Sequence, residues 1–161
     1  MVLFVEEDQK YFLNFSTPEI DVDGQSPFVP LGEMIPLGVF STEALDVPDM
    51  EAGASAKKVC IIDTGYSYDH EDLPKRGVSG SASGEADWAV DGNGHGTHVA
   101  GIIAALEGNG KGVVGVTRSG NLNFYIVKVF DDFGGWIWSS GLMDAVDKCA
   151  DTGANVINFI V

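Results

Sequence analysis

The sequence of 161 residues is long enough for one domain of common size and too short for two full ones. Hydrophobic residues make up 45% of it, which excludes a chain that is disordered throughout. It carries 24 acidic and 9 basic side chains, and the net charge of -15 argues against nucleic acid or an anionic membrane as a partner held by charge.

The first third of the chain differs in composition from the rest. Residues 1–56 contain eleven acidic residues, one basic residue (Lys10) and five of the six prolines. Residues 1–13 lack the basic region of a signal peptide and predict one or two short strands. Proline removes a backbone donor and favours extended structure before it, so residues 14–56 are predicted to be an acidic, proline-rich linker or surface strap. No apolar run in the chain reaches the ~20 residues of a membrane-spanning helix.

From residue 57 onward, short apolar runs alternate with helical periodicity. Three strands are predicted, the first and last of them buried, at residues 59–62, 122–130 and 155–161. Helices are predicted at residues 97–106 and 139–152, and a surface loop at residues 66–94. The order strand, helix, strand, helix, strand indicates an α/β fold with a three-layer parallel sheet over residues 57–161 that stops after the third predicted strand.

The chain has two cysteines, Cys60 and Cys149. They cannot build a disulfide scaffold and could form at most one bridge, so they leave the redox compartment open. Cys60 lies within the first predicted strand and is interpreted as a small, buried hydrophobic residue.

Two residues lie where a parallel sheet gathers its functional groups, at the carboxyl end of a strand and the amino end of a helix. Asp63 ends the first predicted strand, and His95, 32 positions later, precedes the next helix. A buried carboxylate facing the imidazole would fix the ring, as in the orienter and general base of a hydrolase, and we expect the two groups within ~3.5 Å. By composition alone, Asp63 is more often a turn former. His98 suggests a metal pair with His95, but the absence of a His-Glu-x-x-His box favours a packed helix histidine.

Two sequence boxes favour the hydrolase over the turn former. They read VCIIDTG at residues 59–65 and HGTHVAG at residues 95–101. In this order they resemble the aspartate and histidine boxes of the subtilisin-like serine proteases, and the resemblance covers residues 57–159. It implies a secreted, extracellular serine endopeptidase that acts on polypeptide substrates. In such an enzyme Asp63 orients His95, His95 takes the proton of a serine, and the chemistry requires no cofactor.

The nucleophilic serine and the oxyanion-hole asparagine of that family have no counterpart here. The family's serine box is of the Gly-Thr-Ser-Met-Ala type, whereas the one Gly-Thr of this chain, Gly96-Thr97, is followed by His98. We therefore interpret residues 57–161 as the N-terminal half of a catalytic domain, truncated at its end, and expect the chain alone to be inactive. The alternative is a pseudoenzyme or a regulatory fragment that binds a protein partner. Because the last strand would lack its cover, the chain is expected to aggregate or to fold only in part.

The resemblance implies two further sites. Gly134 and Gly135 fall where relatives line the substrate groove, and the neighbouring Trp136 and Trp138 either line it too or belong to the core. Asp72 matches a position that ligates calcium in many relatives, which implies a structural calcium ion. A solvated surface carboxylate is the alternative for Asp72.

The N-terminal segment carries a shorter resemblance to the same family. The VLFVEED stretch of residues 2–8 resembles the last strand of the inhibitory propeptide, and residues 34–39 resemble the opening of the mature enzyme. Residues 1–13 are therefore interpreted as a propeptide remnant, which makes the chain's own propeptide a partner, with maturation cleavage between residues 13 and 34. The alternative is an ordinary hydrophobic staple onto the sheet.

Overall fold

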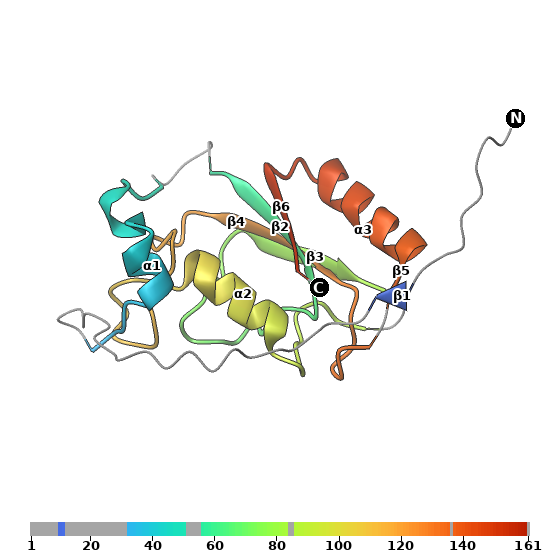
Figure 1. Cartoon of the computed structure of the whole chain (residues 1–161), viewed down its shortest axis with the longest axis horizontal. Coiled ribbons are helices and arrows are strands. Elements are labelled where there is room, and N and C mark those ends of the chain that lie inside the picture. Colours follow the sequence, from blue (N-terminus) through green and yellow to red (C-terminus); the bar gives the residue numbers. More distant parts are fainter. Residues whose placement is uncertain (1–9, 12–31, 51–55, 84–85, 136, 161) are drawn as a thin grey trace, which may run out of the picture.

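The main sheet of the protein has four parallel strands in the order β3-β4-β2-β6. They are β2 (Lys58–Asp63), β3 (Val78–Ala82), β4 (Asn123–Lys128) and β6 (Val156–Phe159). The helices α2 (His95–Ala104) and α3 (Ser139–Asp151) lie on opposite faces of this sheet (Figure 1). The predicted three-layer α/β fold is therefore confirmed.

The computed structural model that shows this fold describes residues 10–11, 32–50, 56–83, 86–135 and 137–160. Three features of the sequence analysis lie wholly or partly outside the described residues: the propeptide-like residues 2–8, residues 14–31 and 51–55 of the strap, and Trp136.

Burial on both faces explains the continuous apolar run of β2. Val59 and Ile61 pack in the cluster that contains the buried side of α2. Cys60 and Ile62 pack in the cluster that contains the buried side of α3. Because successive side chains of a strand point to opposite faces, a strand covered on both sides needs an apolar residue at every position.

Residues 66–94 contain a strand, β3, where the sequence analysis predicted only loop. Its sequence VSGSA is poor in residues that favour strands, and among the described residues its paired neighbour is β4 alone. Gly80 is needed there, because a Cβ atom would lie 2.6 Å from the carbonyl oxygen of Ile126 and 2.6 Å from the Trp88 ring. The prediction of a three-stranded sheet is therefore wrong, since pairing with a neighbouring strand outweighs weak intrinsic preference.

The strand β6 forms where it was predicted but is not buried. It is the outer strand next to β2, so that it has a paired neighbour on one side in the described part of the chain. Val156 is 56% exposed and Ile157 is 40% exposed. The apolar pattern predicted the strand correctly, whereas its burial depends on the position in the sheet.

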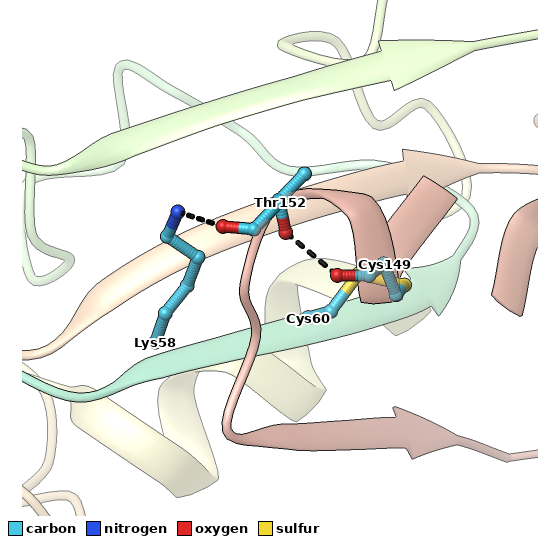
Figure 2. Close-up of a disulfide and its surroundings, with 4 residues drawn as sticks. All are labelled: Lys58, Cys60, Cys149 and Thr152. Atoms are coloured by element: carbon cyan, nitrogen blue, oxygen red, sulfur yellow. Dashed lines mark hydrogen bonds between the residues drawn. A yellow bond between two sulfur atoms is a disulfide. The ribbon is translucent and has the colours of Figure 1, made fainter. Parts of the chain in front are cut away.

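A disulfide joins β2 to α3 through Cys60 and Cys149, which are both fully buried (Figure 2). Cys60 is therefore buried as expected, but it is not a free thiol. The helix end is fixed further by Thr152, whose hydroxyl donates to the carbonyl oxygen of Cys149 at 2.7 Å and whose own carbonyl oxygen accepts from Lys58 Nζ at 2.6 Å. Gly153, at φ 71°, then ends the helix as predicted.

In the N-terminal third, a short strand forms within residues 1–13 as predicted, whereas its pairing partner and two short helices were not predicted. Residues 32–50 contain α1 (Leu37–Ser41) and the 3-10 helix η1 (Ala44–Asp46), and both pack onto Val114. In addition, β1 (Lys10–Tyr11) pairs antiparallel with β5 (Ile137–Trp138) to form a separate two-stranded sheet. None of the helices in the described ranges is long and apolar enough to cross a membrane.

Candidate active site

Asp63 and His95 lie side by side at the carboxyl edge of the main sheet. Asp63 is the last residue of β2, and its side chain is fully buried. His95 is the first residue of α2, and its Nδ1 lies 2.8 Å from Asp63 Oδ1 and 2.9 Å from Asp63 Oδ2. The expected separation below ~3.5 Å is thus met.

The carboxylate determines which imidazole nitrogen carries the proton. An ionised carboxylate only accepts hydrogen bonds, so Nδ1 of His95 donates to it and, in the neutral ring, the lone pair lies on Nε2. Asp63 Oδ1 also accepts the backbone N–H of Thr64 at 2.7 Å, which holds the carboxylate in place. The pair therefore has the geometry of an imidazole base oriented by a buried carboxylate.

The close approach of β2 and α2 depends on Gly96. A Cβ atom there would lie 2.3 Å from the carbonyl oxygen of Gly65 and 3.1 Å from the Cβ atom of Asp63. A residue with a side chain would therefore push the start of the helix away from the end of the strand. Glycine at this position of the HGTHVAG box is thus a steric requirement of the pair.

His98, one turn further along α2, does not join this pair. Its side chain is exposed, so the prediction of a packed helix histidine is wrong. In the part of the chain that the structure describes, no group of three or more His, Cys, Asp or Glu side chains is placed to hold a metal ion.

The sequence analysis missed Asp91, which lies in the loop before α2. Its carboxylate oxygens accept hydrogen bonds from Thr64, Gly94 and Thr97. Burial raises the pKa of the Asp91 carboxyl, but the hydrogen bonds from Thr97, Gly94 and Thr64 outweigh burial and bring the pKa below its ordinary value. Asp91 lies four residues before His95 and not directly before the helix, so the preference for aspartate at a helix start does not identify it from the sequence.

Gly134 and Gly135, expected in the substrate groove, form a tight turn between β4 and β5. The N–H of Gly135 donates to Asp131 Oδ1 at 2.7 Å, and the N–H of Gly134 donates to the carbonyl oxygen of Asp131 at 3.1 Å. Asp132, in the same turn, accepts the N–H of Gly92 at 3.2 Å. The turn is therefore tied to the loop that precedes His95.

Comparison with known proteins shows the family to which the chain belongs. Residues 54–159, about two thirds of the chain, match the subtilase family. This chain belongs to the subtilase family. Subtilisin DY of Bacillus licheniformis is 37% identical over 126 residues, which cover 78% of this chain and 44% of that protein. The thermophilic serine proteinase of Bacillus sp. strain AK1 is 38% identical over 111 residues, which cover 68% of this chain and 27% of that protein.

A solved structure shows the same relationship. The psychrophilic subtilisin-like protease Apa1 from the Antarctic psychrotroph Pseudoalteromonas sp. AS-11 matches with a TM-score of 0.56 and 48% identity. The match covers 63% of this chain and 24% of that structure. The subtilase chain therefore spans less than half the length of these relatives.

In this subtilase, Asp72, the expected calcium ligand, is buried and hydrogen bonded. Its Oδ1 accepts from Asn109 Nδ2 at 2.8 Å and its Oδ2 accepts from the N–H of Val113 at 2.9 Å. With 3% of its surface exposed, Asp72 is not the solvated surface carboxylate that was the alternative. Both of its oxygens are thus engaged by N–H donors.

A second carboxylate, Glu33, enters the same loop from the N-terminal segment. It is fully buried and accepts the N–H groups of Gly108 and Gly110 at 3.0 and 2.7 Å. The hydrogen bond from Gly108, together with those from the other loop amides, outweighs burial and lowers the pKa of Glu33. Calcium is bound by six to eight oxygen ligands, whereas N–H donors face both carboxylates here, so the groups as they stand do not fit the ion. Calcium ligation by Asp72, predicted from the sequence, is untested, and these N–H donors lead us to expect that calcium does not stabilise the chain.

Proposed function

We propose that this chain supplies the aspartate and histidine of a serine endopeptidase. The supporting observation is the contact of 2.8 Å between His95 Nδ1 and the buried carboxylate of Asp63, at the junction of β2 and α2. In the proposed reaction His95 Nε2 takes the proton of a serine hydroxyl as the serine oxygen bonds to the peptide carbonyl carbon. The imidazolium then returns the proton to the leaving amine as the C–N bond breaks, and Asp63 stabilises the imidazolium throughout.

We further propose that the nucleophilic serine is not among the residues of this chain. None of its serines stands in a Gly-Thr-Ser-Met-Ala type box, and no residue matches the family's oxyanion-hole asparagine. On this interpretation, we propose that the 161-residue chain alone does not turn over peptide substrates. Purified chain should neither cleave a fluorogenic peptide nor react with a fluorophosphonate probe, and inhibitor-sensitive turnover by a preparation free of other proteases would contradict this.

The proposed substrates are polypeptides, and one observation supports the chain's own propeptide as a partner. Lys10 and Tyr11 pair antiparallel with Trp138 and Ile137 of β5, which follows the turn of Gly134 and Gly135. An extended segment of the same chain thus lies along a strand that is close in sequence to the expected substrate groove. A peptide substrate would add to such a strand by the same main-chain pairing.

An extracellular site of action is proposed on two grounds. The relatives include subtilisins from Bacillus. In addition, Cys60 and Cys149 form a disulfide, and disulfides form and persist mainly in oxidising compartments. Fractionation of the source cells, with detection of the chain in the medium, tests this proposal.

A chimera provides the direct test of the proposed peptidase. Residues 54–159 of this chain would replace the matching segment of subtilisin DY, which supplies the remaining part of the protein. We expect the chimera to cleave a fluorogenic peptide, and Asp63→Asn and His95→Ala to lower its kcat by about 10⁴- to 10⁶-fold. His98→Ala, on the exposed side of the same helix, is the matched control and should retain activity.

The same chimera separates the enzyme from the pseudoenzyme or regulatory fragment. A chimera that folds but is inactive would favour a binding module. Activity that survives His95→Ala would contradict the role proposed for His95.

A further inference from the structure

The carboxylate of Asp91 connects the segments that carry Asp63 and His95. Its Oδ1 accepts the Thr64 hydroxyl at 2.8 Å and the N–H of Gly94 at 2.9 Å. Its Oδ2 accepts the N–H of Thr97 at 2.9 Å and the Thr97 hydroxyl at 2.5 Å. Thr64 directly follows Asp63, and Gly94 directly precedes His95.

The charge of Asp91 decides the direction of the neighbouring hydrogen bonds. A carboxylate only accepts, so the hydroxyls of Thr64 and Thr97 both donate to it. Their lone pairs are then free to accept, and Thr64 Oγ1 accepts the N–H of Gly96 at 2.9 Å while Thr97 Oγ1 accepts the N–H of Ser67 at 2.9 Å. Two bridges therefore run between the segment after β2 and the first turn of α2.

These bridges fix the part of the molecule on which the pair depends. Asp63 is held by the sheet, whereas His95 is the first residue of a helix, where helices fray most readily. A neutral asparagine at position 91 would replace one acceptor oxygen by an NH₂ group facing N–H or O–H donors. At least one bridge would then break or reverse.

From this geometry we propose that Asp91 is a positioning residue that holds His95 in line with Asp63 by way of the Thr64 and Thr97 hydroxyls. The inference rests on the proposed function, since it assigns Asp91 a role in the reaction of that pair. Asp91 acts through the Thr64 and Thr97 hydroxyls, by fixing where the helix begins.

The first experiment observes the ring of His95 in the 161-residue chain. With ¹⁵N-labelled histidine, the Nδ1–H proton shared with Asp63 should give a downfield signal that exchanges slowly with water. We expect Asp91→Asn to broaden or remove this signal while circular dichroism stays unchanged. Asp87→Asn removes an exposed carboxylate four residues earlier and is the matched control that should keep the signal.

The hydrogen bond from the Thr64 hydroxyl to Asp91 is tested with variants that do not alter any charge. Thr64→Val keeps the shape of the side chain but loses the hydroxyl, whereas Thr64→Ser keeps the hydroxyl. We expect the valine variant to behave like Asp91→Asn and the serine variant to behave like the unmodified chain. This pair also decides the matter if Asp91→Asn fails to fold.

The second experiment measures catalysis in the subtilisin DY chimera. Displacing a catalytic group by about 1 Å costs up to about 100-fold in rate, so Asp91→Asn and Thr64→Val should each lower kcat by about 10- to 100-fold and leave KM unchanged. Equal kcat values in Thr64→Val and Thr64→Ser, together with an unchanged Nδ1–H signal, would overturn the proposal.

Failure of the proposed function itself would look different. If Asp63→Asn left the Nδ1–H signal unchanged, the pairing of Asp63 with His95 would be wrong. If Asp63→Asn removed the signal and both Asp91→Asn and Thr64→Val kept it, only the role of Asp91 would be wrong.

Discussion

The disulfide between Cys60 and Cys149 is expected to contribute a large part of the chain's stability. The two residues are 89 positions apart in sequence, and closing a loop of that length lowers the entropy of the unfolded chain by the equivalent of about 4–5 kcal/mol at 25 °C. Domains are stable by only about 5–15 kcal/mol in total. We therefore expect Cys60→Ala/Cys149→Ala to lower the free energy of unfolding by about 4–5 kcal/mol.

Urea unfolding followed by tryptophan fluorescence measures this loss. Both cysteines are fully buried, so the reductant is added to the unfolded chain before refolding. Reduction should lower the unfolding midpoint of the unmodified chain and have no effect on the double alanine variant, which serves as the control for the reductant. Equal midpoints for the oxidised chain and the double variant would refute the reasoning, because the disulfide would then not stabilise the fold by lowering the entropy of the unfolded chain.

Four further outcomes are expected. Because the pKa of Asp91 is lowered, the contribution of its carboxylate to stability is complete above the ordinary pKa of 3.8 and is lost as the pH falls through the lower pKa of the folded state. An unfolding midpoint that depends on acid pH in the same way in Asp91→Asn as in the unmodified chain would contradict this. Gly96→Ala should cost about 1–3 kcal/mol in urea unfolding and remove the Nδ1–H signal, because the new methyl group meets the carbonyl oxygen of Gly65; unchanged values would argue against the close approach. Since N–H donors engage both oxygens of Asp72, the thermal midpoint should be the same in Ca²⁺ and in EGTA, and a rise in Ca²⁺ that Asp72→Asn abolishes would show a calcium site. The exposed apolar side of β6 should make the chain self-associate, so Ile157→Lys should shift size-exclusion elution toward monomer, and a monomeric unmodified chain would contradict this.

The sequence by itself determined the elements whose pattern is local. The apolar run at residues 59–62 predicted a strand that is covered on both faces. The structure confirms this, because α2 covers one face of β2, α3 covers the other, and each of these positions is buried. The periodicity of residues 139–152 predicted α3, and the two boxes predicted the contact between Asp63 and His95. The strand and the helix are specified by patterns within a few turns of chain. The contact between Asp63 and His95 was predicted from the two boxes, since β3 lies between β2 and α2 in the chain.

Only the tertiary structure decided the features that depend on distant partners. A sequence such as that of β3 does not favour a strand by itself and becomes one because β4 offers it main-chain hydrogen bonds. The disulfide depends on the face to which Cys60 points, and the burial of β6 depends on its place at the edge of the sheet. The hydrogen bonds of Asp91 likewise join loops whose separation in sequence says nothing of their distance in space. Main-chain pairing and side-chain hydrogen bonds join groups that are close in space but can be far apart in sequence. Composition and periodicity describe only residues that are near one another in sequence, so they do not predict these contacts.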